Sequence, residues 1–194
     1  MKKLLGVLVL VFLIVSPASW GETEDRYEIE GMSVEDNLLD YFSLEAIENG
    51  RPYKYESNKF VGVDIYLESS EIYEIVQIHY KKQTSTQYII GSISGGIFFE
   101  NIKDCYRKME EIITDISQSY NDLRKKDKGT WKHPADTTGN STIKSVEFYG
   151  QSSEIIIQCT DWSKKMETTE NIGDNLKVEI STKEFSDFLR YEAY

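Results

Sequence analysis

The stretch that decides the fold is residues 102–126, IKDCYRKMEEIITDISQSYNDLRKK. Apolar side chains recur in it at steps of three and four residues, which is the spacing of one face of an α-helix. Asn101 can cap the start, and the lysines near position 126 suit the negative end before Gly129. We therefore predict an amphipathic helix over residues 102–126. Its buried face would carry Cys105, Tyr106, Met109, Ile112, Ile113, Ile116, Tyr120 and Leu123.

Segments with a period of two lie on both sides of this helix, which predicts β-strands. After the third strand, Gly95 and Gly96 are expected to form a bulge or a sharp exit. Three strands precede the helix and three follow it. They are residues 60–66, 73–81, 87–94, 146–148, 154–160 and 176–180.

Short helices are predicted at both ends of the chain. Ser33 and Ser43 can each cap one before the first strand, and Gly50 can end the second in a left-handed conformation. Ser181 and Glu184 resemble a capping box for a terminal helix. Together the elements predict a single α+β domain over residues 33–194. In it, the long amphipathic helix and the short flanking helices pack on one face of an antiparallel sheet.

The first 21 residues have the layout of a secretory signal peptide. Lys2 and Lys3 precede an apolar run over residues 4–15 that is too short to span a bilayer. Small residues before the cut place cleavage after Gly21, so we expect a periplasmic or secreted protein with no transmembrane segment in the mature chain. Residues 22–32 are rich in acid and are predicted to form a flexible arm.

Charge narrows the choice of partner. The 194 residues include 33 Asp and Glu against 22 Lys and Arg, for a net charge of −11. Removal of the signal peptide takes away two lysines and no acid, which leaves −13. Such a field repels phosphate backbones, so nucleic acid is not expected as a partner. The basic run 124–128 is interpreted as the end of the long helix.

Two cysteines, Cys105 and Cys159, lie in the exported part of the chain. Export to an oxidising compartment favours a disulfide between them. Both fall at inward positions, one on the long helix and one on a strand. We therefore predict a bridge that joins the helix to the sheet.

The polar loop over residues 131–142 is the candidate binding loop, with Trp131, His133 and Asp136 as its candidate residues. His133 and Asp136 could pair as metal ligands or as acid and base, but a solvated turn explains them better. His79 is interpreted as a partly exposed sheet residue. No metal, cofactor or catalytic residue is predicted, because no motif has the spacing that such chemistry needs.

Four runs carry a resemblance to known proteins: EGMSVEDNLLDYF (residues 30–42), ISGGIFF (93–99), DCY (104–106) and KEFSDFL (183–189). The chain resembles a group of small secreted proteins of marine alphaproteobacteria that has no assigned activity. The resemblance covers most of the mature chain. It implies export and a single domain, and it implies no catalytic residue.

These observations favour an exported non-enzymatic module that binds a protein or a small ligand. The binding surface would be a sheet face or the loop of residues 131–136. Two other classes stay open at this point, a cell-envelope hydrolase that uses His133 with Asp136 or other carboxylates, and a structural factor in envelope assembly.

Overall fold

The computed structural model of the chain describes residues 26–66 and 72–193. The predicted signal peptide and residues 22–25 of the predicted arm lie outside this part. Along the described chain the elements are η1 (Leu38–Asp40), α1 (Leu44–Asn49), β1 (Arg51–Lys54), β2 (Val61–Tyr66), β3 (Ile75–Lys82), β4 (Tyr88–Phe99), α2 (Ile102–Ser119), β5 (Arg124–Lys132), β6 (Thr142–Tyr149), β7 (Ser153–Asp161), α3 (Lys164–Glu170), β8 (Asp174–Thr182) and α4 (Lys183–Tyr191).

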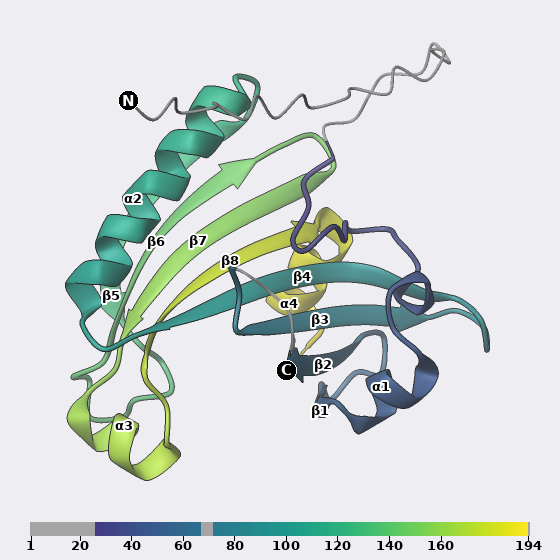
Figure 1. Cartoon of the computed structure of the whole chain (residues 1–194), viewed down its shortest axis with the longest axis horizontal. Coiled ribbons are helices and arrows are strands. Elements are labelled where there is room, and N and C mark those ends of the chain that lie inside the picture. The colour runs from purple at the N-terminus through teal and green to yellow at the C-terminus, as the bar shows by residue number, and fades with distance from the viewer. Residues whose placement is uncertain (1–25, 67–71, 194) are drawn as a thin grey trace, which may run out of the picture.

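The strands form one antiparallel sheet in the order β1-β2-β3-β4-β8-β7-β6-β5. Strands β1 to β4 follow one another as a meander, and α2 then carries the chain to β5 at the far edge (Figure 1). Strands β5 to β8 return as a second meander that ends beside β4. The predicted α+β class with an antiparallel sheet is confirmed, and β1 and β5 are added to the predicted strands.

One face of the sheet is apolar. Strand register places Val63, Ile78, Ile93, Ile180, Ile155 and Phe148 in one row across six strands. Helix α2 packs against this face over β4, β8 and β7, and buries Cys105, Met109 and Ile113 there. The predicted disulfide is confirmed, because Cys105 of α2 and Cys159 of β7 are bonded with their Cα atoms 6.1 Å apart.

The prediction that all helices share one face does not hold, because α4 lies against the opposite face (Figure 1). Its Phe185 ring stacks on His79. His79 follows Ile78 of the apolar row in β3, so its side chain points to the opposite face of the sheet. Phe185 and Phe188 form a second, smaller core with Tyr55 and Phe60. The sheet therefore has two hydrophobic clusters, one on each face.

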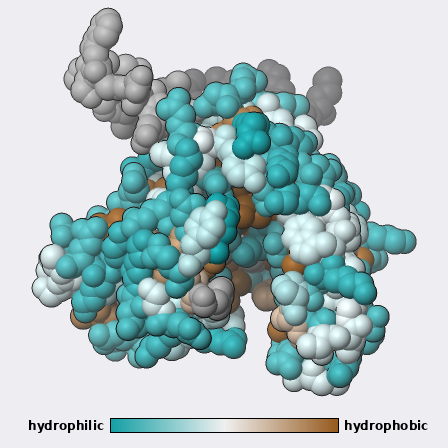
Figure 2. Space-filling view, turned by 180° about the vertical axis from the view of Figure 1, so that it is seen from behind, coloured by the Kyte–Doolittle hydropathy of each residue, from teal (hydrophilic) through white to brown (hydrophobic). Residues whose placement is uncertain are grey.

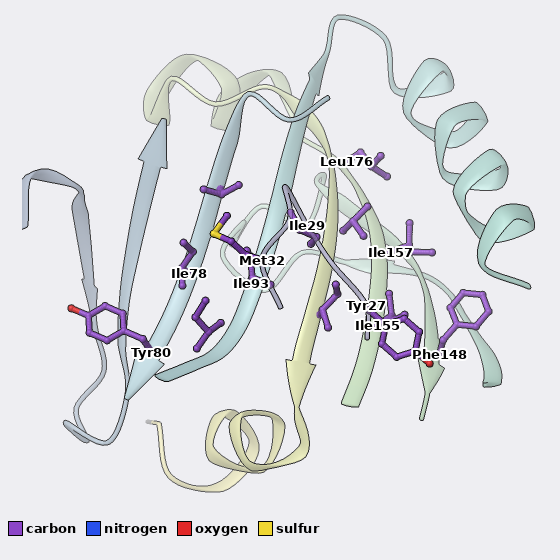
Figure 3. Packing of buried hydrophobic residues seen from close by; sticks show 14 of the residues in the cluster. Tyr27, Ile29, Met32, Ile78, Tyr80, Ile93, Phe148, Ile155, Ile157 and Leu176 are labelled. Atoms are coloured by element: carbon purple, nitrogen blue, oxygen red, sulfur yellow. The ribbon is translucent and has the colours of Figure 1, made fainter. Parts of the chain in front are cut away.

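Residues 26–32, predicted to be part of a flexible arm, are instead packed into the main core. Tyr27, Ile29 and Met32 are buried in the main core on the apolar face (Figure 3), where the Tyr27 ring lies 4.7 Å between centroids from the ring of Tyr120 at the end of α2. The backbones of Ile29 and Met32 exchange two hydrogen bonds of 3.0 Å around a turn at Glu30 and Gly31. Acidic residues dominate the composition of this segment, but the apolar residues between them pack against the sheet.

Helix α2 is shorter than predicted. It ends at Ser119, Asn121 and Asp122 form a turn, and the chain then enters β5. Asn and Asp favour turns because their side chains bond the nearby backbone. The basic run 124–128 is thus part of a strand and not a helix end. All nine residues of β5 are exposed, so its sequence has no alternation of apolar residues that could reveal a strand.

Smaller differences concern caps and bulges. Ser43 caps α1 as predicted, but Gly50 has an extended backbone (φ −63°) and not a left-handed one. The segment predicted to follow a Ser33 cap forms only the short 3-10 helix η1. Thr182, next to the predicted Ser181, caps α4. Gly95 and Gly96 continue β4, whose register with β3 shifts between His79 and Tyr80 instead. No described helix has both the length and the hydropathy to cross a membrane.

Candidate functional site: an open groove on the second sheet face

The structure separates the three residues of the predicted binding loop. Trp131 belongs to β5, opposite Ile143 of β6, and the residue is 38% exposed. His133 lies just after β5, where its backbone N–H donates to the carbonyl of Ser141. Asp136 is buried, with 3% of its surface exposed. The predicted loop therefore begins two residues later than expected, and only Trp131 presents a large apolar surface.

Asp136 holds the loop together. Its two carboxylate oxygens accept hydrogen bonds from the backbone and the hydroxyl of Thr138 and of Ser141, and from the hydroxyl of Ser163. These donors, led by the hydroxyls of Ser141 and Thr138, hold the pKa of Asp136 well below its usual range. Ser163 also caps α3. The carboxylate thus joins the loop to the start of α3, which is a structural task.

His133 is occupied in a different way. Its Nδ1 accepts a hydrogen bond of 3.1 Å from the backbone N–H of Ala135, and its ring lies 4.2 Å from the ring of Trp162 between centroids. Burial lowers its pKa, although the charge of Asp136 opposes this. The loop is therefore a packed clamp between β5 and α3, in which both titratable side chains are already engaged.

A more open site lies on the sheet face opposite α2. Helix α4 covers only one end of this face, and the rest is hollowed between the α1–β1–β2 side and the α3 side of the molecule (Figure 2). We call this hollow of about 390 Å³ the open-face groove. Its volume lies within the range of small-molecule sites. It is lined by Arg51, Asp64, Tyr66, Ile75, Gln77, Ser94, Gly96, Phe98, Asn171, Ile172, Asn175 and Lys177.

Aromatic side chains stand in this groove with much of their surface in solvent. Tyr66 at the end of β2 is 69% exposed, and Phe98 near the end of β4 is 45% exposed. Ile75 and Ile172 add apolar surface to the same lining. Exposed aromatic residues are costly to leave in water and are typical of recognition surfaces, where they supply contact area with few rotatable bonds.

The floor of the groove is made of small and polar side chains. In register, Asp64, Gln77, Ser94 and Glu179 form a row across β2, β3, β4 and β8. The amide of Gln77 donates to Asp64 over 2.8 Å. At Gly96 an added Cβ would meet Ile75 Cγ2 at 2.9 Å and nothing else closer than 3.9 Å. A larger side chain at position 96 would therefore grow into the groove.

An ion pair marks the β8 side of the floor. Lys177 Nζ lies 2.6 Å from Glu179, and the Ser92 hydroxyl donates to the same carboxylate over 3.1 Å. Burial of Glu179 would raise its pKa, but the charge of Lys177 and these hydrogen bonds outweigh burial and lower it. The carboxylate stays ionised and fixes Lys177 at the groove wall.

His79 marks the end of the face that α4 covers. Contrary to the prediction of a partly exposed residue, it is 7% exposed. Its Nδ1 lies 3.0 Å from the Tyr55 hydroxyl, and its ring stacks on Phe185 at 4.8 Å between centroids. Burial lowers the pKa of His79 to about 4, so the ring is neutral at pH 7. It serves as a packed core residue and does not reach the groove.

A sheet face is one of the binding surfaces that the sequence predicts, but the sequence predicts none of the individual groove residues. The available signals were the polar positions that alternate with apolar ones in β2, β3 and β8, together with the glycine pair of β4.

Within the described ranges, no group of three or more His, Cys, Asp and Glu side chains is placed to hold a metal ion. No protein-family model, no curated protein and no solved structure matches this chain.

Proposed function

We propose that the protein is an exported, non-enzymatic binding module whose ligand occupies the open-face groove. The observation that carries this proposal is the combination of exposed Tyr66 and Phe98 with a polar floor on a sheet face that α4 leaves half uncovered. The disulfide supports export, because such bonds persist in oxidising compartments.

The groove lining describes the ligand. Two aromatic rings and two isoleucines favour a ligand with a ring or an apolar side chain. Lys177, Arg51 and Asp64 offer charges of both signs, and the side-chain amides of Gln77, Asn171 and Asn175 offer hydrogen bonds. A peptide segment of a protein partner combines these features, so we propose a protein partner that inserts an apolar side chain between Tyr66 and Phe98.

Binding is favoured over hydrolysis by the state of the titratable groups. Asp136 already accepts hydrogen bonds from three residues, and Nδ1 of His133 accepts one from the backbone. A general base needs a free lone pair within reach of its substrate. These contacts support a structural role for both residues.

Site-directed photocrosslinking in the producing cells tests the proposal. A photoreactive phenylalanine analogue replaces Tyr66 or Phe98 in the full-length chain, and the same analogue at Asp115, exposed on α2, is the control. We expect one reproducible protein adduct from positions 66 and 98 that is absent from position 115.

The variant Gly96→Leu tests whether the groove is the binding site, because the new side chain would fill the groove. It should abolish the adducts at positions 66 and 98, and circular dichroism checks that the variant folds, because the new Cβ would lie 2.9 Å from Ile75 Cγ2 unless that side chain shifts. Adducts that persist in Gly96→Leu, or that form equally from position 115, would overturn the proposal. The absence of any adduct at all three positions would also overturn a protein partner at this groove.

A further inference from the structure

Strand β5 carries a local charge opposite to that of the whole molecule. The chain has a net charge of −11, yet nine consecutive exposed residues of β5 include five cations and one acid, Asp127. Among ion pairs within the described residues, only that of Lys128 with Glu147 involves a β5 cation. The five cations are Arg124, Lys125, Lys126, Lys128 and Lys132.

This strand is also an edge. It is the last strand of the sheet and pairs with β6 alone. An edge strand presents backbone N–H and C=O groups that another extended segment can bond. The pairing with β6 is regular from Arg124 to Asp127 and again from Gly129 to Lys132, with a register shift between Asp127 and Gly129. Two stretches of regular edge are therefore available.

Lysines and bulges on an edge strand also protect against unwanted pairing. They do so because an added strand must place its own side chains beside the cations. That penalty falls on neutral and basic segments, whereas opposite charges across a strand pair attract each other. The same residues that repel most segments therefore select an acidic one. Trp131, on the same strand, adds an exposed aromatic anchor.

We propose that β5 is a docking edge for an extended acidic polypeptide segment, which adds to the sheet as a further strand. The choice of a short segment follows from the net charge. A bilayer or a nucleic acid brings an extended negative surface against the whole acidic molecule, whereas a segment paired with β5 meets mainly the local cations, because charges beyond about 10 Å are screened. This surface is distinct from the open-face groove and does not depend on it.

The test uses a fluorescent nine-residue peptide in which glutamate alternates with valine, matched to the length of β5. A second peptide has the same charge but proline in place of each valine, which removes backbone donors and blocks strand pairing. We expect the first peptide to bind the full mature protein, and the proline peptide to bind roughly tenfold or more weakly. Fluorescence anisotropy at about 0.1 M salt, where charges beyond about 10 Å are screened, measures both affinities.

The variant Lys126→Glu/Lys132→Glu should weaken binding of the valine peptide by roughly tenfold or more. The control Lys103→Glu/Lys165→Glu makes the same change of net charge at exposed positions outside β5 and should leave affinity within about twofold. Circular dichroism melting confirms that both variants fold. Gly96→Leu should bind the peptide normally, so failure of the groove proposal and failure of this one are distinguishable.

Several outcomes would overturn the proposal. Failure of the valine peptide to bind would do so, as would equal binding of the proline peptide, which would indicate charge attraction without strand pairing. Equal loss in the Lys103→Glu/Lys165→Glu control would indicate the overall field. Tighter binding to vesicles of anionic phospholipid would indicate a membrane surface, and dimerisation that the β5 variant abolishes would indicate a second copy of the chain.

Discussion

The two faces of strand β8 differ in how they are covered. Leu176, Val178 and Ile180 point into the main core, which α2 and residues 26–42 close. On the other face, α4 covers Ser181, whereas Lys177 lies in the groove wall. One face is thus devoted to stability, and the other is divided between a small aromatic core and an open surface. The proposed binding site lies on the part of this face that α4 does not cover.

The largest effect is expected from removal of the covalent link on the closed face. Cys105→Ala/Cys159→Ala should lower the free energy of unfolding by about 4 kcal/mol, because the bridge closes a loop with a sequence separation of 54. Urea unfolding of wild type and variant measures the difference. A loss below about 1 kcal/mol would show that packing of α2 alone holds the helix on the sheet.

The second prediction concerns pH and the aromatic core under α4. His79 has a pKa of about 4 in the folded protein against an ordinary value of 6.5, so between these values the unfolded chain binds a proton that the folded chain does not. Stability should therefore fall as pH drops from 6.5 to 4, by about 3 kcal/mol for this group. His79→Gln should remove most of this slope in urea unfolding measured across that pH range. An unchanged slope would assign it to other groups.

The third prediction tests the N-terminal segment on the closed face. Met32 is 2% exposed in the main core, so Met32→Ala should cost about 2 kcal/mol of unfolding free energy. Glu28→Ala, in the same segment but exposed, should change it by less than about 0.5 kcal/mol. Equal effects of the two changes in thermal unfolding would contradict the packing of residues 26–32.

The smallest effect on stability is expected on the open face. Tyr66 is 69% exposed, so Tyr66→Ala should shift the free energy of unfolding by less than about 0.5 kcal/mol. The same change should abolish the crosslink formed from position 98. A large loss of stability with no change in crosslinking would make Tyr66 a structural residue and remove the contrast between the two faces.

Elements that bury apolar residues could be predicted from the sequence, and elements that bury none could not. The start of α2, the strands β2, β3 and β8, and the disulfide were predictable because each buries a regular apolar stripe or a paired cysteine. Strands β1 and β5 bury no residue, and α3 buries none either, so no periodicity distinguishes them from loops. The basic run of β5 fitted a helix end equally well, since charge alone carries no period.

The candidate site was less predictable than the fold. The sequence predicts Trp131, His133 and Asp136 from their place in a polar loop, but hydrogen bonds from Thr138, Ser141 and Ser163 make Asp136 part of a clamp. The groove joins residues from β1 to β4, β8 and the segment after α3, which are distant in the sequence. No local motif can represent such a surface.

By itself the sequence determined the α+β class, the long amphipathic helix and the pairing of Cys105 with Cys159, because the periodicity of burial and the chemistry of thiols are local properties. Only the tertiary structure decided that α4 takes the opposite face, that β5 forms the outer edge and that a groove stays open over β1 to β4, β8 and the segment after α3. Those features depend on strand order and on where each helix stops, and both are set by packing between segments far apart in the chain.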